Sequence, residues 1–182
     1  MSITLRFSGA LSGLDTERRA LLARDAAASS DIAQATRDII SAVRADGDLA
    51  LFELTRTLDG VEVSALEVPR TAIDAAVMAL QPEVRNALER AARNITSVHK
   101  AMMPVSIATS PERGITVGRR VDPLDRVGVY APGGRAAYPS SVLMAAIPAR
   151  IAGVREVILP SPPGTTGLPS PVVVAAAAIA RV

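Results

Sequence analysis

The sequence of 182 residues contains no cysteine and only one histidine, His99. Without cysteine there is no disulfide framework, no thiol nucleophile and no thiolate ligand for zinc or an iron–sulfur cluster. One histidine cannot form a His–His metal pair, and a Ser-His-Asp triad would have to use His99 itself. This residue lies at the end of an apolar-periodic helix, where interaction with the helix dipole or with solvent is the more common role. Composition therefore indicates no metal site.

Long apolar runs and a strong charge excess are also missing. No uncharged apolar stretch approaches the roughly 20 residues of a membrane-spanning helix, and the longest candidate, Val172 to Ile179, is soon followed by Arg181. No signal peptide is evident at the N-terminus. The formal net charge is only +2 and the basic residues are scattered, which argues against a nucleic-acid surface. We expect a folded cytoplasmic protein with no membrane or nucleic-acid partner.

The first hundred residues carry mainly helical patterns, after a short strand expected over residues 3–7 and a small helix opened by Asp15. One helix is expected from about residue 30 to Gly47, and the next is expected from Asp48 to Gly60. The second helix has three leucines predicted to face inward: Leu51, Leu54 and Leu58. Three aspartates could suggest a carboxylate site, but each falls where a cap or turn needs a short acceptor, so we assign them structural roles: Asp46, Asp48 and Asp59.

A longer apolar periodicity follows and continues to about Met103. Its members are spaced by threes, fours and sevens: Ile73, Val77, Leu80, Val84, Leu88, Ile95, Val98 and Met102. Gln81-Pro82 interrupts it, because proline suits the first turn of a new helix and disfavours helical geometry in the residue before it. The pattern therefore predicts two helices.

After Pro104 the pattern changes to short strands separated by turns. Strands are predicted at residues 115–117 and 126–130, joined through residues 118–125, and again at residues 157–159. A helix from about Ser140 to Gly153 lies between the last two strands, which predicts a right-handed strand–helix–strand unit with a parallel pair. The expected fold class is α/β, with a helical N-terminal region followed by an incomplete Rossmann-like unit.

Another apolar helix is predicted to begin at Val172, just before the sequence stops. A parallel sheet normally has several strands and is covered on both faces, so we expect the chain to be a truncated part of a longer protein. An apolar segment such as Val172 to Ile179 would be a solubility liability unless another chain covered it.

The strand at 126–130 ends in an aromatic hydroxyl and a glycine-rich turn, Tyr130-Ala131-Pro132-Gly133-Gly134. Ligands bind at this end of parallel strands, and the following helix N-terminus at Ser140-Ser141 would offer N–H groups to an anion such as pyrophosphate. The spacing differs from the Gly-x-Gly-x-x-Gly fingerprint, and such a turn is more often structural on sequence alone. For Tyr130, ligand binding and simple packing of the ring remain equally open. For Tyr138 we favour a role in covering the core edge.

The stretch from Pro123 to Met144, including this turn, strongly resembles the histidinol dehydrogenase family. The resemblance continues from Ala145 to Pro163, and upstream Asp46-Gly47-Asp48 is similar to the family's N-terminal helical region. It implies two NAD-dependent oxidations that carry L-histidinol through the aldehyde to L-histidine, the last steps of histidine biosynthesis, with zinc holding the substrate. It also implies two incomplete nucleotide-binding-like α/β domains with small terminal extensions, assembled as an intertwined homodimer.

The family's Tyr-x-Pro-Gly-Gly motif places its cofactor-binding tyrosine on Tyr130, and Pro132, Gly133 and Gly134 shape the same loop. Members of the family are more than twice as long, and their zinc ligands and paired Glu-His acid/base residues fall beyond the part matched here. We therefore expect no catalytic residue and no metal ligand within this chain, and no histidinol oxidation by the chain alone.

The resemblance divides the chain into an N-terminal extension (1–24), a mainly helical part of a first α/β domain (25–125, with a strand near 115–121) and the start of an incomplete nucleotide-binding-like domain (126–182). Two alternatives to an inactive enzyme fragment remain open. One is an interaction module, or half of a split enzyme, that pairs with a complementary C-terminal fragment or another subunit. The other is a stand-alone nucleotide-binding domain, which is less favoured because the remaining NAD contacts of the family lie downstream.

Overall fold

A computed structural model describes residues 13, 15–16, 30–133 and 136–182. The chain divides into two compact units, Met1–Ala50 and Leu51–Val182. The strand expected over residues 3–7 lies outside the described residues, and so does the helix expected after Asp15, except for its first two positions. Within the described part of the chain, no helix combines the length and the apolar character needed to cross a membrane.

The first described helix, α2, runs over Ser30–Asp46 and ends at Gly47, whose φ of 57° is in the left-handed region that favours glycine. The next helix, α3, covers Asp48–Leu54, with Asp48 in its first turn. Both predicted helices are thus confirmed. Asp46 and Asp48 lie at helix ends, as the structural interpretation of these carboxylates requires.

The predicted inward position of Leu58 is wrong. After Leu54 the helix widens into a π-helix, η2, over Thr55–Asp59, and it ends at Gly60 with φ 68°. A π-helical turn contains more residues than an α-helical turn, so it rotates Leu58 away from the face shared by Leu51 and Leu54. The side chain of Leu58 is 68% exposed.

Two helices follow, α4 over Arg70–Met78 and α5 over Pro82–Ala101. Gln81 has extended backbone angles, φ −60° and ψ 141°, and Pro82 begins the new helix. The predicted break is therefore confirmed, with the geometry that proline imposes on the residue before it. Leu88, near the middle of α5, is buried in the main core.

The chain then forms a β-hairpin whose first strand the sequence did not predict. Strand β1 covers Ile107–Glu112 and pairs antiparallel with β2, Ile115–Arg119, and the register shifts between Thr109 and Glu112. Gly118 belongs to β2 rather than to a connecting segment. A Cβ at this position would lie 2.5 Å from the carbonyl oxygen of Ile107, so glycine permits the close approach of the two strands.

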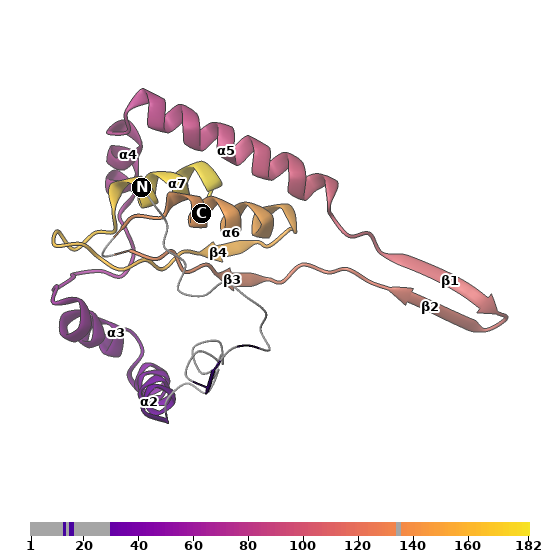
Figure 1. The fold of residues 1–182 in the computed structure, drawn as a ribbon, viewed down its shortest axis with the longest axis horizontal. Helices are drawn as coiled ribbons and strands as arrows, with labels where there is room; N and C mark the ends of the chain where they lie inside the picture. The colour runs from indigo at the N-terminus through magenta and orange to yellow at the C-terminus, as the bar shows by residue number, and fades with distance from the viewer. Residues whose placement is uncertain (1–12, 14, 17–29, 134–135) are drawn as a thin grey trace. The chain divides into compact units, whose positions relative to one another are not determined.

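The predicted strand–helix–strand unit consists of β3 (Arg126–Gly128), α6 (Pro139–Ile151) and β4 (Glu156–Ile158), with β3 and β4 parallel. The register pairs Val127 with Val157 in the centre of each strand. Gly153, with φ 93°, follows the end of α6. Figure 1 shows this unit in orange and yellow beside α7 and α5. The expected α/β class is confirmed.

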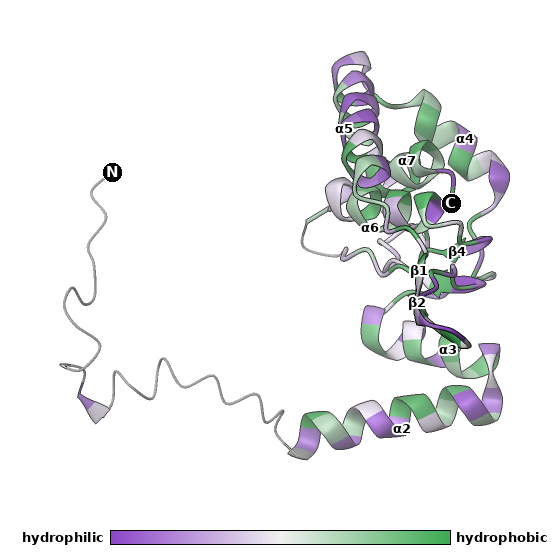
Figure 2. Ribbon diagram, turned by 90° about the vertical axis from the view of Figure 1, so that its right-hand side faces the viewer, coloured by the Kyte–Doolittle hydropathy of each residue, from purple (hydrophilic) through white to green (hydrophobic). Residues whose placement is uncertain are grey.

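The last helix, α7 (Pro171–Ala180), lies in the core instead of forming an exposed tail. It contacts α4, α5 and α6, and Val173, Ala175 and Ala176 are fully buried. The helices around α7 are part of the same chain, so the predicted need for a second chain to cover this segment is wrong. Figure 2 shows α7 as mostly hydrophobic, whereas α5 also carries hydrophilic residues. Such all-round apolar character is typical of a buried helix.

Candidate functional site

The loop that follows β3 is fixed by hydrogen bonds to the segment that follows β4. The N–H of Val129 donates to the carbonyl of Ile158 at 2.8 Å, and the N–H of Ala131 donates to the carbonyl of Pro160 at 3.0 Å. Both side chains are buried, Ala131 completely. The parallel pair therefore continues past its assigned strands and holds the backbone on either side of Tyr130.

Tyr130 itself projects away from this anchored backbone. Its side chain is 63% exposed, whereas the side chains of Val129 and Ala131 are buried because successive residues of an extended chain point to opposite faces. Packing of the ring in the core is thus not its role. Tyr138, at the start of α6, is 46% exposed and covers the core edge only in part.

Gly133 brings this loop against the loop that follows β4. A Cβ at Gly133 would lie 3.3 Å from Cδ of Pro162 and 3.5 Å from Oγ of Ser161. The two loops are therefore packed closely at the carboxyl edge of the parallel pair, where ligands bind in sheets of this type. Pro132 is half-buried in the same loop, and Gly134 lies outside the described residues.

Ser161 is a site candidate that the sequence reasoning missed. Its Oγ is buried and has no hydrogen-bond partner among the residues that the structure describes. A buried hydroxyl without a partner is uncommon, because it loses the hydrogen bonds it would make in water. Its position three residues after the end of β4, in the loop that corresponds to the Tyr130 loop after β3, was the signal available in the sequence.

A hollow of about 580 Å³ lies beside these loops. Its walls come from α4, from the loops after β3 and β4, and from the start of α7, and most of them are small or apolar: Ala72, Ala75, Ala76, Gly133, Ala137, Pro162, Pro171 and Val174. No charged side chain lines it, among those that the structure describes. It can take an uncharged, flat or apolar group beside Gly133.

The predicted anion site at the start of α6 is only partly present. The helix begins at Pro139, which has no N–H, and the N–H of Ser141 donates to the carbonyl of Tyr138 at 3.1 Å. One of the two expected donors is therefore already used. The positive end of the helix dipole lies at Tyr138 and Pro139, where α6 begins.

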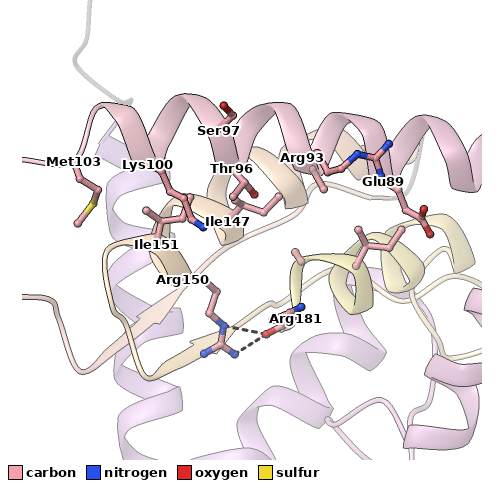
Figure 3. A pocket seen from close by; sticks show the side chains of 13 residues that line it. Glu89, Arg93, Thr96, Ser97, Lys100, Met103, Ile147, Arg150, Ile151 and Arg181 are labelled. Atoms are coloured by element: carbon pink, nitrogen blue, oxygen red, sulfur yellow. Dashed lines mark hydrogen bonds between the residues drawn. The ribbon is translucent and has the colours of Figure 1, made fainter.

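A larger hollow of about 1180 Å³ lies between α5, α6 and the end of α7 (Figure 3). It has a basic lining that includes Arg93, Lys100, Arg150 and Arg181. Arg150, however, donates to the backbone carbonyls of Val154, Arg155 and Arg181, which lie just beyond the ends of helices. Carbonyls at helix ends lack partners within the helix, so this arginine has a structural role.

No group of three or more metal-ligating side chains is present in the described ranges. His99 lies in the last turn of α5 and is half-buried, which agrees with a role at the helix end. Asp59 is the last residue of η2. Within these ranges, therefore, no set of side chains is gathered that could hold zinc.

Comparison with known proteins identifies the family. The family profile described as "Histidinol dehydrogenase" matches residues 22–182, which include the Tyr130 loop and Ser161. The chain belongs to the histidinol dehydrogenase family. This family consists of oxidoreductases of histidine biosynthesis, as the resemblance implied.

Individual relatives agree with the family profile. A histidinol dehydrogenase of Ralstonia nicotianae is 44% identical over 191 aligned positions, which cover 100% of this chain and 43% of the relative. One of Burkholderia lata is 42% identical, with coverage of 90% and 40% respectively. The crystal structure of histidinol dehydrogenase from Elizabethkingia anophelis matches with a TM-score of 0.83 at 26% identity, and covers 96% of this chain and 39% of that chain. The chain therefore spans only about two-fifths of the length of these histidinol dehydrogenases.

Proposed function

We propose that this chain supplies part of the NAD site of a histidinol dehydrogenase that oxidises L-histidinol to L-histidine through the aldehyde, with two NAD molecules reduced. The observation that carries the proposal is the Tyr130 loop. The ring of Tyr130 is 63% exposed, while the backbone on both sides of it is hydrogen-bonded to the segment after β4. An exposed aromatic ring on a fixed backbone is suited to stacking against a flat heterocycle, because little freedom is lost on binding.

The surrounding groups fit a dinucleotide. Ser161 offers a buried hydroxyl without a described partner, Gly133 permits close approach of the backbone, and the start of α6 supplies a positive dipole end. Pro132 and Gly134 belong to the same proposed loop. When bound, NAD accepts the hydride from the substrate alcohol. The contribution of this chain is to hold and orient the cofactor.

Zinc and acid/base groups are not proposed for this chain. The sequence has no cysteine and one histidine, and the described residues contain no cluster of three ligating side chains. Proton removal from an alcohol needs a positioned base, and that base is expected outside these residues. We therefore propose that the 182-residue chain alone does not oxidise histidinol.

A second proposal is pairing with a complementary C-terminal fragment, as in a split enzyme. The parallel pair β3–β4 has only two strands in the described part of the chain, so each strand has an outer edge without a partner strand. Parallel sheets usually contain more strands, and an open edge is a template for another one. In this proposal, residues 126–182 are the start of a nucleotide-binding-like domain that the C-terminal fragment would complete, and residues 25–125 belong to the first domain.

The test is NADH formation by the purified chain with histidinol, NAD and zinc, alone and after mixing with the C-terminal portion of the Ralstonia nicotianae relative. We expect activity only in the mixture. Tyr130→Ala should raise the KM for NAD by about 5- to 150-fold, because loss of one stacking contact costs about 1–3 kcal/mol. Tyr138→Ala is the matched control and should change the KM little. Robust activity of the chain alone, or an unchanged KM in Tyr130→Ala, would contradict the proposal.

A further inference from the structure

The hollow of about 1180 Å³ lies between the second half of α5 and the ends of α6 and α7 (Figure 3). One wall is formed by residues of α5 that are spaced by three and four positions, and such residues lie on one side of a helix: Glu89, Arg93, Thr96 and Lys100. The other walls contribute three isoleucines, which are Ile147 and Ile151 from α6 and Ile179 from α7. The hollow therefore combines an apolar floor with a charged wall.

Positive charge dominates the lining of this hollow. Among the described residues that line it, Glu89 is the single acidic side chain, and four are cationic: Arg93, Lys100, Arg150 and Arg181. Arg150 binds backbone carbonyls, whereas the charged groups of the other three cations have no ion-pair or hydrogen-bond partner in the described part of the chain. The ends of the three helices contribute roughly −0.5 elementary charge each, so they neutralise only about half of the excess.

The backbone of Arg181 is held in an unfavourable conformation. Its φ of 63° and ψ of 45° lie in the left-handed region, where glycine is the usual residue after a helix. Its carbonyl accepts hydrogen bonds from Arg150 and its N–H donates to the carbonyl of Ala178 at 3.1 Å, contacts that a glycine would make equally well. The fold therefore does not require an arginine here. Strained residues are concentrated at ligand-binding sites, and the side chain of Arg181 lines the hollow.

We infer that the hollow binds a small anion of the phosphate or pyrophosphate class, held by Arg93, Lys100 and Arg181. A guanidinium group binds two phosphate oxygens at once, and an ammonium group binds them as a point charge. Thr96 is half-buried between the two cations of α5, and its hydroxyl can donate a further hydrogen bond. Figure 3 shows Thr96 and Lys100 extending from α5 towards α6.

This anion site lies at the opposite end of α6 from the Tyr130 loop. The helix begins at Pro139, next to that loop, and its last residue, Ile151, lines the hollow. A helix of 13 residues, with a rise of about 1.5 Å per residue, separates the two places by about 20 Å. The inferred anion is therefore not the pyrophosphate of an NAD molecule at the Tyr130 loop. The inference goes beyond the proposed function and does not rest on it.

The test is calorimetric titration of the purified chain with inorganic pyrophosphate, with amide NMR shifts to locate the site. We expect saturable binding of one pyrophosphate per chain that weakens at high salt, with shifts in the last turns of α5 and at the end of α7. Arg93→Gln and Lys100→Gln should each raise the Kd about two- to fivefold, the effect of losing one partly exposed charge contact. Arg90→Gln is the matched control, because Arg90 lies on the same helix but does not line the hollow, and its loss changes the net charge equally.

Arg181→Gly separates binding from folding. This variant removes a cation and the backbone strain together, so its Kd for pyrophosphate should rise about two- to fivefold while its urea midpoint also rises. A purely structural arginine would not change the affinity for pyrophosphate. The inference would be overturned by a lack of saturable binding, by equal Kd changes in Arg90→Gln and Arg93→Gln, by an unchanged Kd in Arg181→Gly, or by shifts confined to the Tyr130 loop. None of these measurements depends on NADH formation, so their failure would leave the proposed function untouched.

Discussion

The guanidinium of Arg150 donates two hydrogen bonds to the backbone carbonyl of Arg181, at 2.9 Å from Nε and 2.6 Å from Nη2. Arg150 lies in the last turn of α6, and Arg181 is the residue that follows α7 (Figure 3). A third hydrogen bond, from Nη1 to the carbonyl of Arg155, measures 2.8 Å. One side chain thus joins the ends of two helices to the segment that leads into β4.

Arg150→Met should therefore lower the free energy of unfolding by about 1–2 kcal/mol, because carbonyls that pair with a charged donor lose that partner and the site is open to water. Urea unfolding followed by circular dichroism measures the change. Arg70→Met is the control, since Arg70 makes only an exposed ion pair with Asp74 at 3.2 Å, and its loss should change stability by less than about 0.5 kcal/mol. Equal effects of the two substitutions would contradict this role of Arg150.

Arg181 is the only non-glycine residue with a positive φ, 63°, among the residues that the structure describes. Left-handed backbone costs an L-residue about 1–2 kcal/mol, whereas glycine adopts it without a Cβ clash. Arg181→Gly should raise the stability by about 0.5–1 kcal/mol, since the greater freedom of glycine in the unfolded chain offsets part of the gain. The carbonyl that Arg150 binds remains present. A higher urea midpoint for Arg181→Gly than for Arg181→Ala tests this expectation.

Substitutions at two neighbouring residues of α6 should differ greatly in their effect on stability, because only one of them packs in the core around α7. Leu143 is 1% exposed and Met144 is 58% exposed. Leu143→Ala should cost about 2–5 kcal/mol, since it removes buried methyl groups and leaves a cavity against α7. Met144→Ala should cost less than about 1 kcal/mol, because its side chain is mostly in water. Unfolding midpoints of the two variants that differ little would contradict the placement of this core.

Helices were predictable here because their signals are local. Apolar spacing, the Gln81-Pro82 break and the glycines at 47 and 153 each act within a few residues, and all appear in the structure. Strand β1 was missed because Pro111 and a register shift interrupt its alternation, and because every residue in it is exposed. The position of α7 was also missed, since burial of a helix by three others depends on contacts distant in the sequence.

The candidate site was predictable only in part. The Tyr130 loop follows from the rule that parallel strands present ligands at their carboxyl ends. The exposure of Tyr130 does not follow from the sequence, and neither does the lack of a hydrogen-bond partner for Ser161 Oγ among the described residues. Both depend on how the loops after β3 and β4 meet. Gly133 illustrates the difference. The sequence shows that this position is a glycine in a turn, but only the structure shows that it packs against Ser161 and Pro162.

The ion pair between Glu53 and Arg56 should make a small part of the fold's stability depend on pH. A side-chain hydrogen bond from Arg56, 2.5 Å between Nη2 and Oε1, holds the pKa of Glu53 below its ordinary value. A carboxyl whose pKa is lowered by folding stabilises the fold above its unfolded pKa, and this contribution is lost as the pH falls through the folded pKa. Carboxyl NMR titration should therefore show a rise in the Glu53 pKa in Arg56→Gln. The same titration in Arg70→Gln should leave the Glu53 midpoint as in the wild type.

Substitution at Gly133 tests the contact between the two loops. A Cβ there would meet Pro162 at 3.3 Å, which is closer than ordinary van der Waals contact, so the loops after β3 and β4 must separate slightly. Gly133→Val should lower stability by about 1–3 kcal/mol, as overpacking usually does, and should displace the backbone that positions Tyr130. Gly128→Ala is the control, because its Cβ would meet nothing within 4 Å.

The two consequences of Gly133→Val can be separated. Urea unfolding reports the packing of the loops, and the KM for NAD in the mixture with the C-terminal portion reports the position of Tyr130. Because Gly133 contacts the loop of Ser161 and Pro162, we expect both quantities to change in Gly133→Val and neither in Gly128→Ala. If stability fell while the KM for NAD stayed the same, the loop contact would stabilise the fold without determining the position of Tyr130.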